Sequence, residues 1–557
     1  LFAQVFMNAS DAGETFLLRT GQVMVDKSNQ KVAQVQHSLA FADGRQTFVY
    51  GADYIATNPT TGGTINGRNE AIDNFTEAGG YVHSITHLNK YWDAVTAIRY
   101  DKHSKLTSGN WSPRAALVYN PSDAHSFRVS YNKAFSNPST NNQSLDLAAG
   151  YVGGTNSTNS LFTVRALGTP VSGFQFRRDC VGAPGGLCMK SPFNPAGRQP
   201  FTPAIAANYY KGAVAAAAAG GMENSIKAGL AAQGIPASLI PVVSGAMMQI
   251  LAGLQPTSAQ VGTVLRSLNP TTARFSDVGA TDVRDIDLIR PTLTTGWEAG
   301  WKGQLGKKFY GTVDWWYSER NDFVGPLIVE TPNVFLDRNT LTGFLNAGLA
   351  AGLTPVLGPA TAGAIAAGFS PSLAASLGGI SNSSTTGVPL GVVNPDNPLS
   401  NSTDIVLAYR NFGRVRINGF DFSANYLLDD SWSLFGTYSW VNRDFFSRAE
   451  VGGLSDIALN APRDKGTASI RYRDDASGIS SDVRFRRTAS FPGNSGVYIG
   501  QVQQYNLIDA SFTFRPTVLG GAMISVMAQN LLNLKHAEFI GGAALGRLVM
   551  TRVQYAF

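Results

Sequence analysis

INGFDFSANYLLDDSWSLFGTYSW, the stretch from Ile417 to Trp440, alternates apolar and polar residues on both sides of a short turn at Asp429 and Asp430. A period of two is that of an extended strand, because successive side chains point to opposite faces. One face carries Phe420, Phe422, Ala424 and Tyr426 before the turn and Trp432, Leu434, Gly436, Tyr438 and Trp440 after it. The stretch therefore predicts an antiparallel hairpin with a single apolar face.

The same alternation recurs along the chain, for example in HSFRVSYN from His125 and in NLIDASFTFR from Asn506. The chain ends on RLVMTRVQYAF, in which the apolar residues Val553, Tyr555 and Phe557 share one face. Arg552 and Gln554 occupy the opposite face of this last stretch. We count about sixteen or seventeen strand-like segments of this kind. The chain is therefore predicted to be all-β.

Composition indicates that the apolar faces do not meet water. Only 15% of the residues are charged and 10% are aromatic, whereas an ordinary soluble domain has about 25% charged residues. Trp and Tyr often lie near the predicted strand ends, as in the interfacial girdles of membrane barrels. The net charge of +6 is mild and forms no block of Lys or Arg, so a nucleic-acid partner is not expected.

The lengths of the connections alternate between short and long. Short turns include LGKK, Leu305 to Lys308, and DDAS, Asp474 to Ser477, whereas residues 137–289 and 325–403 form two very long connections. Transmembrane barrels have short turns at one rim and long loops at the other. We predict a transmembrane antiparallel up-and-down β-barrel whose two longest extracellular loops carry short helices in their Ala-rich stretches. The apolar segment 237–254 contains Pro, Ser, Gly and Gln, which favours a loop helix over a membrane span.

The sequence contains two cysteines, Cys180 and Cys188, inside the first long connection. Gly and Pro residues between them can turn the chain back, and the spacing fits neither a CxxC redox pair nor a four-ligand zinc site. A loop disulfide is predicted, which would place the protein in an oxidising compartment outside the cytosol. Two unpaired thiols are the alternative.

Four segments together resemble the TonB-dependent outer-membrane receptors, specifically the C-terminal part of their β-barrel. They are NWSPRAALVYNPSDAHSFRVSYNKAFSNPS from Asn110, IRPTLTTGWEAGWKGQL from Ile289, YRNFGRVRINGFDFSANYLLDDSWSLFGTYSWV from Tyr409, and AQNLLNLKH from Ala528. Thr292 and Asp421 stand where the family usually has Glu. The four segments occur in the family's order, and the resemblance covers nearly the whole chain apart from the two long connections.

The resemblance implies the outer membrane of a Gram-negative-type bacterium and a 22-stranded barrel with a plugged lumen. Our strand count is smaller, and the N-terminal part resembles neither a plug nor a TonB-contact segment. We therefore expect residues 1–557 to be a barrel fragment that lacks the plug and the first strands; a smaller complete barrel is the alternative. In the family, a terminal aromatic strand is also the signal read by the barrel-assembly machinery, which here implies Val553, Tyr555 and Phe557.

No catalytic constellation was found, so we predict that the protein is not an enzyme and needs no cofactor or metal. His83 and His87 lie on a predicted strand, about 13 Å apart, and cannot share a metal ion. Asp282, Asp285 and Asp287 form an acidic cluster for which solvation or contacts to nearby Arg are favoured over a calcium site.

Charged residues of both signs lie on the polar faces of the predicted strands. On the lipid face an Arg costs about 2–4 kcal/mol at the bilayer midplane. We therefore expect these side chains to face the lumen, where they would contact a plug or, near the outer rim, a ligand. The candidates are Arg114, Arg128, Asp314, Asp421, Asp509 and Arg552.

Two classes of function fit the sequence. The first is an energised importer that interacts with outer-membrane lipid and, through a plug, with TonB, and that takes up a scarce, bulky ligand: a siderophore, cobalamin, an oligosaccharide or a peptide. The second is a passive porin or an adhesive surface barrel. The family resemblance favours the importer, whereas composition alone does not separate the two.

Overall fold

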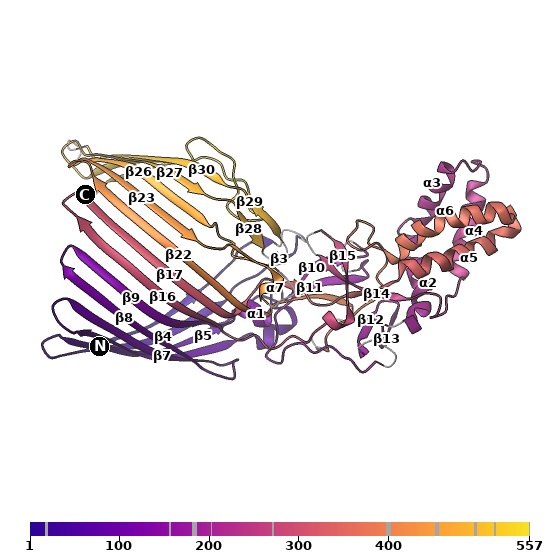
Figure 1. The fold of residues 1–557 in the computed structure, drawn as a ribbon, viewed down its shortest axis with the longest axis horizontal. Coiled ribbons are helices and arrows are strands. Elements are labelled where there is room, and N and C mark those ends of the chain that lie inside the picture. Colours follow the sequence, from indigo (N-terminus) through magenta and orange to yellow (C-terminus); the bar gives the residue numbers. More distant parts are fainter. Residues whose placement is uncertain are drawn as a thin grey trace.

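The computed structural model describes residues 1–16, 21–154, 158–180, 186–201, 203–269, 272–396, 403–451, 456–494, 498–516 and 520–555. A sheet of 16 strands dominates the structure. A domain with most of the helices projects beyond the strand ends at one rim of that sheet (Figure 1). Every neighbouring pair of strands in the large sheet is antiparallel. The predicted all-β, up-and-down barrel architecture is thereby confirmed.

Strands of the large sheet pair in the order in which they occur along the chain, and β1 and β32 lie at its two ends. They are β1 Phe2–Ala9, β4 Asn29–Phe41, β5 Gln46–Asn58, β6 Phe75–His87, β7 Trp92–His103, β8 Asn110–Ser122, β9 His125–Ser136, β16 Thr292–Leu305, β17 Phe309–Val324, β22 Asn411–Leu427, β23 Trp432–Val441, β26 Asp464–Asp474, β27 Ile479–Thr488, β30 Tyr505–Phe514, β31 Ala522–Gln529 and β32 Leu548–Tyr555.

The register confirms the apolar face predicted for the hairpin from Ile417 to Trp440. Phe420 lies opposite Trp440 and Phe422 opposite Tyr438, and directly opposed residues of an antiparallel pair share a face of the sheet. The large apolar side chains of this face remain exposed, as 48% for Val483 and 47% for Phe512 illustrate. We call this side of the sheet the apolar face and the other side the polar face. An apolar face exposed on strand after strand is what a barrel presents to lipid.

The two rims of the sheet differ. Both chain ends and the short turns lie at one rim, whereas both long connections leave from the other rim (Figure 1). We call them the short-turn rim and the long-connection rim. This asymmetry agrees with the alternating connection lengths read from the sequence.

Both long connections contain helices and strands. The first holds α1 Thr140–Ser144, β10 Asp146–Val152, β11 Phe162–Leu167, β12 Cys188–Ser191, β13 Asn194–Pro200, α2 Pro203–Ala219, α3 Met222–Ala232, α4 Ile240–Gly253, β14 Thr263–Asn269, β15 Arg274–Val278 and η3 Ala280–Asp282. The second holds β18 Ile328–Val329, β19 Asn333–Leu336, α5 Arg338–Leu357, α6 Pro359–Gly378, β20 Gly391–Val392 and β21 Asp404–Ala408.

Shorter elements decorate the other connections. They are η1 Gly67–Ile72, α7 Arg448–Val451 and the strand pairs β2 Thr15–Phe16 with β3 Val23–Met24, β24 Phe445–Phe446 with β25 Ile457–Ala458, and β28 Phe491–Asn494 with β29 Ile499–Val502.

The two long connections fold together into one domain, which we call the loop domain (described residues of 140–289 and 328–408). Strand β11 of the first connection pairs in parallel with β21 of the second. Strands β12 and β14 of the first connection pair with β20 and β19 of the second. The resulting sheets have the orders β10-β11-β21-β18 and β13-β12-β20-β19-β14-β15. Neither connection is therefore an independent loop.

Helices α2 to α6 form the far end of the loop domain (Figure 1). Leu230, Met247 and Leu251 of the first connection share a fully buried core with Leu345 and Leu349 of the second. By length and composition alone, α5 and α6 are long and apolar enough to cross a membrane. In α5, however, the leucines recur at every fourth position and point into this core, so packing within the loop domain accounts for its apolar stripe.

Helices α5 and α6 are longer than the short helices expected from the sequence. Each spans 20 residues and retains a proline, Pro355 in α5 and Pro371 in α6. The shared core stabilises these helices, because tertiary packing of an apolar face routinely outweighs local helix propensity.

We predict that Phe512→Arg on the apolar face will lower the free energy of unfolding of the barrel by about 2–4 kcal/mol if this position lies near the bilayer midplane. Ser511→Arg, one residue earlier and on the polar face, should have a much smaller effect, because Ser511 lies opposite Asp482. Heat-modifiability on gels and urea titration in lipid vesicles measure both variants. Equal effects of the two substitutions would show that the faces are wrongly assigned.

Candidate functional site

The polar face carries a row of charged groups across four neighbouring strands. Register places Arg128 of β9 opposite Gly300, Gly300 opposite Asp314, and Asp314 opposite Asp421. A side chain at Gly300 would collide with the Asp314 carboxylate, so this glycine leaves room for the charged row. Three of the predicted lumen-facing residues are thus neighbours on one face.

Each member of this row has a polar neighbour on the same face. Arg128 Nη2 lies 2.9 Å from Glu298 Oε2 and 4.0 Å from Asp314 Oδ1. The Trp316 Nε1–H group donates to Asp421 Oδ2 over 2.9 Å. The side chains of Arg128, Glu298 and Asp314 are 39–41% exposed. They therefore remain accessible from the space beside the polar face.

The other predicted residues lie elsewhere on the polar face. Asp509 pairs with Arg486 across β30 and β27 at 2.6 Å and also accepts the Asn530 amide. Arg114 lies opposite Asn132, and Arg552 lies opposite Ser525. Within the described part of the chain, no hydrogen-bond or ion-pair partner is found for Arg114 or Arg552.

A second charge cluster on the polar face was not identified from the sequence. Arg99 binds both carboxylate oxygens of Asp53, at 2.7 and 2.8 Å, and also pairs with Asp101. Gly79 lies beneath this cluster, and any side chain there would collide with Arg99 and Asp101. A cavity of about 400 Å³ adjoins it, with Glu77 in its lining. Alternation within β7 places Arg99 and Asp101 on one face, but Asp53 becomes their partner only through the register of three strands.

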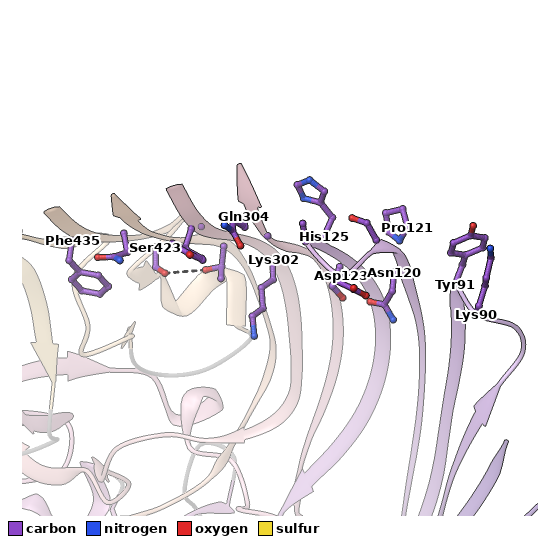
Figure 2. Close-up of a pocket in the computed structure, with 18 residues that line it drawn as sticks. Lys90, Tyr91, Asn120, Pro121, Asp123, His125, Lys302, Gln304, Ser423 and Phe435 are labelled. Atoms are coloured by element: carbon purple, nitrogen blue, oxygen red, sulfur yellow. Dashed lines mark hydrogen bonds between the residues drawn. The ribbon is translucent and has the colours of Figure 1, made fainter. Parts of the chain in front are cut away.

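A cavity of about 1000 Å³ lies at the short-turn rim. Figure 2 shows its side chains along a curved rim of strand ends. Thr312 donates to Ser423 over 3.3 Å in its wall, two residues along their strands from Asp314 and Asp421. Lys90, Lys302 and Asp123 supply the charges of the lining, beside amides, hydroxyls and aromatic rings. The cavity is thus a continuation of the polar face toward this rim.

A buried ion cluster joins the loop domain to the long-connection rim. The Asp146 carboxylate of β10 is fully buried and pairs with Arg68 at 2.7 Å and with Arg165 at 2.8 Å. Arg165 also pairs with Asp404 of β21 at 3.2 Å. Arg68 belongs to η1 in the connection between β5 and β6, so the cluster links a barrel connection to both halves of the loop domain. Sequence spacing gave no signal for it, because the partners come from four separate segments.

The electrostatics of this cluster favour the ionised carboxylate. Burial by itself opposes ionisation of Asp146, but the hydrogen bonds and positive charge of Arg68, together with the charge of Arg165, outweigh burial and hold the pKa of Asp146 below its ordinary value. The Asp146 carboxylate is therefore ionised at neutral pH.

The structure joins Cys180 and Cys188 by a disulfide with a Cα–Cα distance of 5.4 Å, as predicted. In the acidic cluster, Asp285 pairs with Arg178 at 2.7 Å and Asp287 with Arg290 at 3.4 Å. Asp282 accepts the Gly279 amide instead. The arginine contacts expected for this cluster are present for two of its three members.

Among the described residues, one group of three potential metal ligands has its ligand atoms close together, Asp179 with Cys180 and Cys188. Its two sulfurs are consumed by the disulfide, so this group is not a metal site. His83 and His87 lie on the strand β6, as the alternation predicted.

The terminal strand β32 pairs with β31, and Val553 lies opposite Ile524 while Tyr555 lies opposite Ala522. Both residues belong to the apolar face. Phe557, the third residue of the proposed assembly signal, lies outside the described residues.

Comparison with known proteins adds three findings. The family model described as "TonB dependent receptor-like, beta-barrel" matches residues 4–170 and 249–534. A mutant of the ferric enterobactin receptor PfeA from Pseudomonas aeruginosa, solved in complex with enterobactin, has a TM-score of 0.50 and 9% identity. The match covers 100% of this chain and 59% of that one. No curated protein matches the chain.

Two further solved structures are similar over a comparable length. The siderophore receptor PirA from Acinetobacter baumannii has a TM-score of 0.47 and 10% identity, with 96% of this chain and 57% of that chain covered. The FrpB iron transporter from Neisseria meningitidis has a TM-score of 0.47 and 11% identity, with coverages of 96% and 56%. The chain therefore spans less than two thirds of the length of these structures, and at such identities the likeness concerns the fold alone.

We predict that Asp146→Asn will loosen the base of the loop domain. Removing one member of a buried ion cluster leaves uncompensated charge and costs about 3 kcal/mol. Hydrogen exchange should show faster opening of β10 and β11. Asp285→Asn is the matched control, because the Asp285 side chain is 49% exposed in its pair with Arg178. An equally small effect of both substitutions would contradict an anchoring role for Asp146.

The same cluster predicts an acid-sensitive loop domain. A carboxylate whose pKa is lowered by folding stabilises the folded state above its ordinary pKa near 3.8 and loses that contribution as pH falls through the lower folded value. Exchange protection of β10 and β11 should therefore decline below about pH 4, more steeply in the wild type than in Asp146→Asn. Identical pH profiles would exclude Asp146 as the titrating group.

Proposed function

Because the chain belongs to the TonB-dependent receptor β-barrel family, we propose that it forms part of an outer-membrane receptor that imports a scarce, bulky ligand. The single observation that carries the proposal is the family match over most of the barrel strands. In this account the apolar face contacts lipid, the polar face lines the lumen, and the long-connection rim faces the outside of the cell. The role is transport, not catalysis.

The loop domain supports a receptor role. Its two connections share one hydrophobic core, and a disulfide ties the first of them. A loop ordered before binding loses less conformational entropy when a ligand arrives. The loop domain therefore offers a preorganised surface beyond the long-connection rim. A passive pore needs only loops that narrow its opening.

For the ligand we propose a ferric siderophore as the class to test first. The similar solved structures are named as receptors for ferric enterobactin or siderophores and as an iron transporter. Cobalamin, an oligosaccharide or a peptide are the other ligand classes that the experiment distinguishes.

The remaining partners belong to the same proposal. TonB would act through a plug domain, and that plug would contact the candidate residues of the polar face, Arg114, Arg128, Asp314, Asp421, Asp509 and Arg552. The last strand, with Val553, Tyr555 and Phe557, would be read by the barrel-assembly machinery.

The proposal predicts energy-dependent iron uptake. A strain that lacks the complete gene should take up less radioactive iron from a ferric siderophore under iron limitation, and the gene supplied in trans should restore uptake. Deletion of the tonB gene should abolish the restored uptake. Arg128→Gln should reduce uptake while leaving the heat-modifiable barrel intact, because it removes a charge from the row on the polar face.

Three outcomes would overturn parts of this account. Uptake that persists without TonB would favour a passive porin. Growth restored on a glycan or cobalamin, but not on ferric siderophore, would replace the ligand class. Adhesion without any uptake would favour an adhesive surface barrel.

A further inference from the structure

The apolar face carries an aromatic belt near the long-connection rim. Tyr131 of β9 packs on Trp297 of β16 with 4.9 Å between ring centroids, and Trp297 lies opposite Tyr317 of β17. One step along, Trp315 lies opposite Phe420 of β22. Such belts mark the boundary between hydrocarbon and headgroups in membrane barrels.

Directly beyond this belt, the same face changes from aromatic to charged. Register aligns Lys133 with Thr295, Thr295 with Glu319, and Glu319 with Arg416. In the next row Asn321 lies opposite Arg414. Two residues along a strand correspond to about 7 Å, and the headgroup layer on each side of the hydrocarbon is about 5–7 Å thick. The charged row therefore lies at headgroup depth.

The two arginines share one carboxylate. Arg416 Nε lies 2.8 Å from Glu319 Oε2, and Arg414 Nε lies 3.4 Å from Glu319 Oε1. Tyr317 also donates to Glu319, and Arg414 Nε also donates to Asn321. Within the described part of the chain, the hydrogen bonds found for both arginines use Nε alone. Each of the two side chains is 56% exposed.

A cross-strand ion pair alone does not explain this arrangement. Exposed ion pairs contribute only about 0–1 kcal/mol, and one arginine suffices to pair with Glu319. By contrast, Arg443 in the connection between β23 and β26 pairs with its own carboxylate, Glu450. Here Arg414 and Arg416 share a single carboxylate, and Lys133 lies in the same cross-strand row. These three cations and one anion leave the row with an excess of positive charge.

We propose that Lys133, Arg414 and Arg416 form a binding site for the phosphorylated headgroup of an anionic lipid in the outer leaflet. Planar guanidinium groups suit phosphate because they bind two of its oxygens at once. Lys133 is three strands from Arg416, about 14 Å away, and reaches a second phosphate of the same headgroup. The proposal rests on the outer-membrane location proposed above.

The test is lipid binding by the assembled protein in detergent micelles, measured by native mass spectrometry. The probes are a bis-phosphorylated lipid A and, as the neutral lipid, phosphatidylcholine. We expect the Arg414→Gln/Arg416→Gln double variant to bind lipid A about tenfold more weakly than the wild type, the equivalent of about 1.4 kcal/mol. Phosphatidylcholine should bind both proteins equally.

The matched control is Arg473→Gln, at the short-turn rim, where Arg473 is 70% exposed and pairs with Asp475. It should change lipid A binding less than twofold. The Arg414→Lys/Arg416→Lys variant keeps both charges and should bind with intermediate affinity, which separates headgroup recognition from loss of the fold. Heat-modifiability on gels verifies assembly of every variant.

Three results would overturn the proposal: equal lipid A binding by the wild type and the double glutamine variant, an equal loss in the Arg473→Gln control, or full displacement of lipid A by inorganic phosphate, which would indicate a site for free anions. Membrane fractionation distinguishes failure of the lipid site from failure of the proposed location. A protein that does not belong in the outer membrane would not co-fractionate with that membrane, whatever its affinity for lipid A.

Discussion

The parallel pairing of β11 with β21 is the contact on which the loop domain depends. It joins Thr163–Leu167 of one long connection to Asp404–Ala408 of the other, and the central residues of β21 are fully buried. Without it, each connection would have unpaired strands and an exposed apolar face. The pairing becomes accessible because β9, β16, β17 and β22 are neighbours in the barrel. That adjacency brings both connections to the same rim, which reduces the entropy cost of bringing β11 and β21 together.

The barrel and the loop domain distribute polar groups according to the same physical constraint. Buried backbone groups must be paired, so a continuous antiparallel sheet suits the wall, and two composite sheets suit the interior of the loop domain. Charges are kept where they can be solvated or paired. On the polar face Arg99 lies between Asp53 and Asp101, and at the base of the loop domain Asp146 lies between Arg68 and Arg165. With only 15% charged residues, the protein places charged groups on the polar face of the sheet, at its junction with the loop domain, and around Glu319 near the long-connection rim.

The parts that were predictable from the sequence are those governed by local order. The hairpin from Ile417 to Trp440 was correct because a period of two depends only on neighbouring residues, and the disulfide was correct because its cysteines are close in sequence. Alternation also assigned Arg128, Asp314 and Asp421 to one face. It did not identify Asp53 as the partner of Arg99, because that pair depends on the register of three strands. The joint folding of the two long connections and the full length of α5 and α6 were missed for a similar reason. The two helices pack on each other, but their shared core also includes α3 and α4, which lie about 100 residues earlier in the chain.

Hydrogen exchange of a Leu407→Asp variant tests the joint folding of the long connections most directly. Leu407 is fully buried in β21 and belongs to a core cluster that includes Phe162 and Val164 of β11. A charge at this position should release the amides of β21 and β11 together, although β11 belongs to the other connection, while β16 and β17 keep their protection. Loss of protection confined to β21, with β11 still protected, would show that each connection folds independently and would contradict the account.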